Sequence, residues 1–172
     1  MNEDLHKACL NALSDELRAA LESGSAAVVN TTGFSMNPFI YSHRGDRVVL
    51  RAADIDNLKI YYSVPLFVRQ QDNRLILHRL IAKKDGEFII QGDGETSIQY
   101  VKPEQIVAEA IGFYRKGKYV DCESRGYRRF VRIWMALRFL KPAWLFCRRQ
   151  FRRVCTHIFK KEYWKKPKNQ PE

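Results

Sequence analysis

Three residue types that together can form an activated nucleophile are spread over the first two thirds of this 172-residue chain. Ser35 lies in the turn-like stretch TTGFSMNPF, His78 in the apolar run LILHRLI, and Asp93 in the loop-like stretch QGDGE. In an activated serine, an imidazole accepts the hydroxyl proton and a carboxylate holds the imidazole in the right tautomer. Taken alone, Ser35 is typical of a turn residue, because Gly, Ser, Asn and Pro are the usual residues of loops. Chemistry therefore depends on whether the fold brings the three side chains together.

A β-hairpin is predicted for RLILHRLIAKKDGEFIIQGDGE, residues 74–95. Asp85-Gly86 separates two apolar, alternating runs, and such a dipeptide suits a two-residue turn in which both central residues have positive φ. This turn pairs Lys84 with Glu87 and sets the register of both strands.

Continued without interruption, the same register places His78 directly opposite Asp93. Opposed residues of an antiparallel pair have Cβ atoms about 4.5–5.5 Å apart, which is within hydrogen-bonding reach. Two alternatives stay open: a structural His–Asp contact without chemistry, or no contact at all if Gly92 and Gly94 form a bulge that shifts the register.

The first segment, residues 1–24, is predicted to be an amphipathic helix that ends near Gly24. It lacks the basic start, continuous apolar core and small-residue cleavage site of an export signal, so neither export nor membrane spanning is expected of it. Its apolar stripe recurs every four residues, as Leu5, Cys9, Leu13, Leu17 and Leu21.

The second segment, residues 25–120, is predicted to be a small, mostly antiparallel β domain. Short apolar runs such as AAVVN, DRVVLRA, LKIYYSVPLFVR, EFIIQG and IVAEAIGFYR are mostly bounded by Gly, Asp, Asn or Pro. The fold class is thus α+β and mainly β, with an N-terminal helix and a basic C-terminal helical tail.

The third segment, residues 121–172, carries nearly all of the positive charge. Of the formal net charge of +11, residues 125–172 contribute +13 and residues 1–124 contribute −2. An apolar stripe from Phe130 to Ile158 advances in steps of three and four, and Pro142 predicts a break between two helices, because proline suits only the first turn of a helix. No charge-free run approaches the roughly twenty residues that a spanning helix needs.

This basic tail, residues 125–168, has two equally supported interpretations. Its aromatic residues and positive charge suit an interfacial helix on an anionic membrane, whereas its apolar stripe suits packing on the protein's own β domain. Nucleic acid is a weaker third partner, because a basic tail without a binding fold is a poor footprint.

The four cysteines, Cys9, Cys122, Cys147 and Cys155, form no C-x-x-C pair. They predict reduced thiols in a cytosolic setting, no zinc site, and no cofactor.

The motifs GFSMNPFI, RGDRVVL, LILHRLI and QGDGE resemble, in this order, four boxes of signal peptidase I-like serine endopeptidases. The resemblance covers residues 26–118 and is nearest to short bacterial members. It implies a hydrolase that cleaves a signal or leader peptide by acyl transfer, refuses bulky or β-branched residues at the cleavage site, and lays an extended peptide along a strand edge.

Carried over by position, the resemblance makes Ser35 the nucleophile and an oxyanion donor through its own N–H. His78 matches the base of the type in which histidine replaces lysine, and Asp93 matches the acidic residue of the third box. Two features depart from the family pattern: Gly94 stands where asparagine is usual, and a second Gly-Asp before the middle strand is missing.

Two other classes of protein compete with this interpretation. Self-cleaving repressors share the family's fold, but they need an N-terminal DNA-reading domain and an Ala-Gly or Cys-Gly bond, and this sequence has neither dipeptide. A non-catalytic peptide-binding or membrane-associated module with a degenerate peptidase fold is the alternative that remains. The expected location is the membrane periphery at the cytoplasmic face, or alternatively the soluble cytoplasm.

Overall fold

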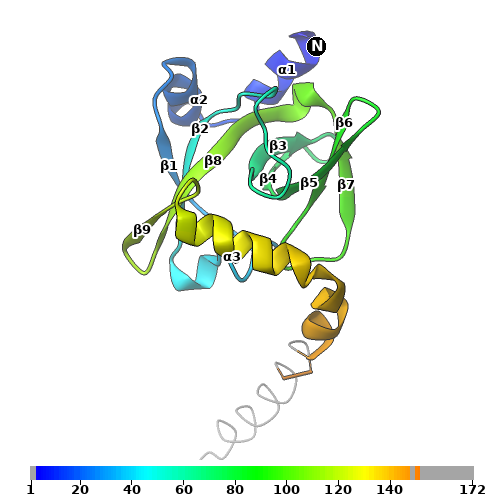
Figure 1. The fold of residues 1–172 in the computed structure, drawn as a ribbon. Coiled ribbons are helices and arrows are strands. Elements are labelled where there is room, and N and C mark those ends of the chain that lie inside the picture. The colour runs from blue at the N-terminus through cyan, green and yellow to red at the C-terminus, as the bar shows by residue number, and fades with distance from the viewer. Residues whose placement is uncertain (1–2, 148–149, 152–172) are drawn as a thin grey trace, which may run out of the picture. The chain divides into compact units, whose positions relative to one another are not determined.

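The computed structural model describes residues 3–147 and 150–151. It is an α+β structure, mainly of antiparallel strands, with helices before and after them (Figure 1), as the sequence predicts. The helices and strands, in chain order, are α1 Glu3–Leu10, α2 Asp15–Glu22, β1 Ala27–Asn30, β2 Arg47–Ala52, β3 Pro65–Arg69, β4 Arg74–Leu77, β5 Arg79–Lys84, β6 Glu87–Gln91, β7 Ile98–Val101, β8 Ile106–Arg115, β9 Lys118–Asp121 and α3 Arg125–Ala136.

Two sheets form the body. The larger has the order β1-β2-β8-β3-β4, with β9 also paired to β8, and the smaller has the order β5-β6-β7. The strand β8 is ten residues long because it serves several neighbours: β2 on one side, and β3 and β9 on the other. β1 and β4 end the larger sheet, so among the described residues each leaves one edge free of strand partners.

The N-terminal segment forms two helices, whereas the sequence predicts a single one. Ser14 ends the connection between them, and its hydroxyl accepts a hydrogen bond from the Leu17 backbone N–H at 3.3 Å as an N-cap. The predicted apolar stripe is nevertheless correct, because Cys9, Leu13, Leu17 and Leu21 are all buried in the main core.

The run LKIYYSVPLFVR forms a strand only from Pro65 onward, although its composition predicts a strand throughout. Residues 59–63 instead form a turn, in which the Ser63 backbone N–H donates a hydrogen bond to the Lys59 carbonyl at 2.9 Å. Tyr61 adopts a φ of +71°, which a strand cannot accommodate.

The basic segment divides at residue 136 into parts that we describe separately. The helix α3 belongs to the body, where Tyr127 and Val131 are buried in the same core as the β-strands. In the second part, residues 141–147 are helical, and Pro142 is the second residue of this helix, as predicted. The later members of the apolar stripe, Val154 and Ile158, lie outside the described residues.

Candidate active site

The serine turn, residues 33–39, follows β1 and carries Ser35 half-buried at its bend. The Asn37 backbone N–H donates to the Phe34 carbonyl at 3.1 Å, which tightens the bend. Met36 and Phe39 are both buried in the main core and anchor the turn on either side of its tip. Ser35 is therefore placed on a rigid support.

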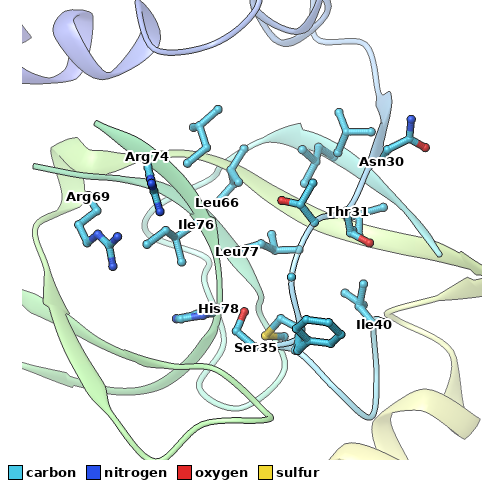
Figure 2. A pocket seen from close by; sticks show the side chains of 18 of the residues that line it. Asn30, Thr31, Ser35, Ile40, Leu66, Arg69, Arg74, Ile76, Leu77 and His78 are labelled. Atoms are coloured by element: carbon cyan, nitrogen blue, oxygen red, sulfur yellow. The ribbon is translucent and has the colours of Figure 1, made fainter. Parts of the chain in front are cut away.

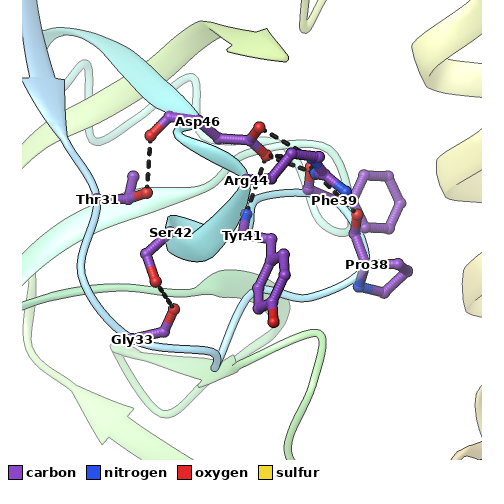
Figure 3. A network of polar contacts seen from close by, with 8 residues as sticks. All are labelled: Thr31, Gly33, Pro38, Phe39, Tyr41, Ser42, Arg44 and Asp46. Atoms are coloured by element: carbon purple, nitrogen blue, oxygen red, sulfur yellow. Dashed lines mark hydrogen bonds and ion pairs between the residues drawn. The ribbon is translucent and has the colours of Figure 1, made fainter. Parts of the chain in front are cut away.

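Asp46, from the motif RGDRVVL, ties the serine turn to the sheet (Figure 3). Its buried carboxylate accepts hydrogen bonds from Arg44 Nε at 2.9 Å and from the Tyr41 backbone N–H at 3.0 Å. Its backbone carbonyl accepts from the Thr31 hydroxyl at 2.9 Å, and Arg44 also donates to the Phe39 carbonyl at 3.1 Å. This motif therefore supports both ends of the turn, which is a structural role.

His78 is the single residue between β4 and β5, where the chain passes from the larger sheet to the smaller. Its backbone N–H donates to the Pro65 carbonyl at 3.3 Å, and its ring lies edge-on to Phe67 with centroids 6.2 Å apart. The imidazole is 4 % exposed. These contacts hold the ring in one place at the junction.

Ser35 and His78 converge at one end of a groove, where Figure 2 shows their side chains next to each other. Both also lie against Gly92. A Cβ atom built on Gly92 would be 2.6 Å from the Ser35 carbonyl oxygen and 3.1 Å from His78 Nε2. Only glycine fits at this position, and its presence allows the serine and the imidazole to meet.

The predicted alignment of His78 with Asp93 is wrong. The hairpin does turn at Asp85-Gly86, both with positive φ, and Lys84 pairs with Glu87. The register then shifts between Leu80 and Ala82, so that Leu80 pairs with Ile90. The extra residue Ile81 makes a β-bulge, and every later pair moves by one position.

Asp93 pairs with Arg79, the residue after His78, and both side chains are fully buried. Arg79 Nε donates to one carboxylate oxygen at 2.9 Å and Nη2 to the other at 2.7 Å, which is a bidentate ion pair. Burial alone would lower the pKa of Arg79, but the Asp93 carboxylate and the Tyr127 side chain together outweigh it and raise the pKa. The bidentate partner of Asp93 is therefore the neighbour of His78 in the chain.

Gly94 lies directly against the serine turn. Its backbone N–H donates to the Ser35 carbonyl at 2.6 Å. A Cβ atom here would be 2.7 Å from the Phe34 carbonyl oxygen and 3.1 Å from that of Asn37. Because backbone atoms crowd this side of Gly94, an asparagine would not fit without a shift of the serine turn.

Glu95 is a site residue that the sequence did not reveal. Its Oε2 atom lies 3.9 Å from His78 Nε2, and its side chain is 43 % exposed at the groove. The loop that carries it has no periodicity that would have marked it, and its position depends on the unforeseen bulge in β5.

The groove has a volume of about 690 Å³ and is bordered by the two free strand edges. Val29 and Asn30 of β1 line it, as do all four residues of β4. Its floor is apolar and reaches Leu17 of α2. No motif predicted that this helix would line the groove. No lysine lines it among the described residues, and Lys83 and Lys84 are exposed elsewhere on β5.

Comparisons of the chain with protein-family models, with curated proteins and with solved structures find no match. Within residues 3–147 and 150–151, no three His, Cys, Asp or Glu side chains gather as a metal site. The site is therefore defined by its geometry and by the order of the four motifs.

Proposed function

We propose that this protein is a serine endopeptidase with a signal peptidase-like catalytic site. The observation that carries the proposal is the meeting of Ser35 and His78 at one end of a groove between two free strand edges. A serine hydroxyl becomes a useful nucleophile only when a base can take its proton.

In the proposed reaction, His78 accepts the Ser35 proton while Ser35 Oγ attacks the carbonyl carbon of the peptide. The imidazolium then gives that proton to the departing amine, and the acyl group stays on Ser35. His78 next takes a proton from water, which attacks the acyl-enzyme and releases Ser35. The Ser35 backbone N–H is the oxyanion donor that the family resemblance implies. Arg79, Asp93 and Gly94 hold the two catalytic residues in register.

The substrate is proposed to be a signal or leader peptide bound in extended form. The free edges of β1 and β4 offer backbone N–H and C=O groups for strand addition, and the apolar floor accepts alternate side chains. The same edges would bind a peptide without cleaving it, so a non-catalytic peptide-binding module is the second candidate.

Mass spectrometry of a mixed peptide pool, incubated with the protein in the presence of liposomes, separates the two candidates. We expect cleavage by the parent protein and none by Ser35→Ala or His78→Ala. Ser25→Ala and His6→Ala are matched controls, because Ser25 is exposed, His6 is half-buried on α1, and neither lines the groove; both variants should cleave normally. The binding module would be favoured if the parent protein cleaved no peptide, or if Ser35→Ala cleaved peptides as well as the parent does.

No helix among the described residues is long and apolar enough to cross a membrane. We propose peripheral attachment at the cytoplasmic face. Support comes from α3, which has no acidic residue, and on which Arg125, Arg129 and Arg132 lie near the exposed Phe130 and Ile133. Arginine next to exposed apolar groups suits the interface of an anionic bilayer.

A further inference from the structure

The helix α3 contacts the buried Arg79–Asp93 ion pair through Tyr127, which is 6 % exposed. The Tyr127 hydroxyl oxygen accepts a hydrogen bond from Arg79 Nη1 at 3.2 Å. The same nitrogen donates to the Tyr61 carbonyl at 2.7 Å, while Nε and Nη2 donate to Asp93. All three nitrogens of the buried Arg79 guanidinium are thus bound, and one partner comes from outside the β domain.

Tyr127 also contacts the serine turn. Its ring meets Phe39, the last residue of that turn, edge-on at a centroid distance of 5.7 Å. The Arg79 guanidinium lies over the same Phe39 ring at 4.6 Å. Phe39, Arg79 and Tyr127 therefore form one buried cluster, which is joined through the chain to the serine turn at Phe39 and to His78 at Arg79.

Tyr127 stays a neutral hydroxyl in this cluster. Burial raises the pKa of Tyr127 above its ordinary value, although Arg79 opposes the rise. Burial also raises the pKa of the neighbouring Cys122 thiol to about 12, so the thiol is protonated as well. The charge in the cluster is that of Arg79, balanced by Asp93.

We propose that Tyr127 is a positioning residue for the Ser35–His78 pair, an inference that rests on the proposed function. Arg79 follows His78 directly in the chain, and Asp93 precedes Gly94, whose N–H holds the Ser35 carbonyl. Any displacement of the guanidinium therefore moves the base relative to the nucleophile. The first helix of the basic segment is part of the catalytic unit.

The test is the rate at which a fluorophosphonate phosphonylates Ser35, with an O–P bond formed to Ser35 Oγ and fluoride released, followed by intact-protein mass spectrometry. Tyr127→Phe keeps the buried ring and removes only the hydroxyl. Its phosphonylation rate constant should fall about tenfold, the size expected when a hydrogen bond to a charged group is lost. Tyr100→Phe is the matched control, because Tyr100 is 59 % exposed on β7, and its rate should equal that of the parent.

Peptide turnover gives a second readout. Because Tyr127 does not line the groove, kcat should fall while KM stays unchanged. Equal rates per folded molecule in Tyr127→Phe and the parent would overturn the positioning role, even if the melting temperature fell. If the parent neither cleaves peptides nor is labelled at Ser35, the proposed function itself fails and the positioning role falls with it.

Discussion

At the scale of single residues, the carboxylate nearest to the His78 imidazole in the groove is Glu95, at 3.9 Å from Nε2. The charge of the Asp93 carboxylate is balanced by the Arg79 guanidinium, with which it forms a buried ion pair. A half-exposed carboxylate can stabilise an imidazolium as it forms, and it can rotate away when a substrate enters. We therefore assign to Glu95 the electrostatic part of the role that the sequence predicted for Asp93.

Replacing Glu95 by glutamine should move the acid limb of the pH–rate profile to lower pH. The carboxylate favours the protonated imidazole, so its removal lets His78 lose its proton at lower pH, and kcat should fall several-fold. Arg69 and Arg74, the other charged residues lining the groove, are unchanged in this variant. The measurement is kcat/KM between about pH 5 and 9.

Glu87→Gln is the control for this profile, since Glu87 lies beside the hairpin turn and outside the groove. A profile of Glu95→Gln that overlays that of the parent would remove Glu95 from the mechanism.

At the scale of elements, the site depends on a backbone-to-backbone contact between two loops. The loop of residues 92–94 touches the serine turn through two glycines that leave no room for side chains. The sequence gives little sign of such contacts. A bulge at Gly92 and Gly94 was one of the two alternatives to the predicted register, whereas the bulge lies at Ile81 and the two glycines allow the close approach of the loops.

Gly94→Ala should therefore damage both activity and stability. The added Cβ would meet backbone carbonyl oxygens at 2.7–3.2 Å, and the serine turn would have to move. We expect a loss of roughly 1–3 kcal/mol in the free energy of unfolding, and at least a tenfold loss in kcat. Chemical denaturation and peptide turnover measure the two effects.

Gly126→Ala provides the contrast. Gly126 lies in α3, and a methyl group added there would have nothing within 4 Å, so alanine should be neutral or stabilise the helix by up to about 1 kcal/mol. If Gly94→Ala and Gly126→Ala had equal stability and equal kcat, the close approach at Gly94 would not be required for activity.

At the scale of the whole molecule, the sequence predicted the strands and the hairpin turn better than the contacts that join them. Alternating apolar runs revealed most strands, and Asp85-Gly86 revealed the hairpin turn, because both signals are local. The bulge at Ile81 and the partnership of Arg79 with Tyr127 involve residues distant in sequence or register, for which no periodicity exists. The order of the motifs led us to expect Ser35 and His78 at one site, and both lie against Gly92.

The charge of the whole molecule makes a further prediction. Flotation with anionic liposomes should recover the parent protein, and neutral liposomes should recover much less of it. Changing Arg125, Arg129 and Arg132 together to glutamine should weaken binding by about 1 kcal/mol for each residue, or roughly 100-fold in total.

The matched control removes the same charge elsewhere, by changing Lys83, Lys84 and Lys118, all exposed on the strands, to glutamine. Equal loss of flotation in both triple variants would mean that net charge, and not α3, governs liposome binding.

The shortness of the two free edges has a consequence for the protein at high concentration. Unpaired edges invite other copies to add strands, and long, flat ones are a common origin of aggregates. Here β1 and β4 are each four residues long, or roughly 13 Å. So short an edge forms only a few hydrogen bonds with any guest strand, which suits brief occupancy by a flexible peptide and discourages lasting self-association.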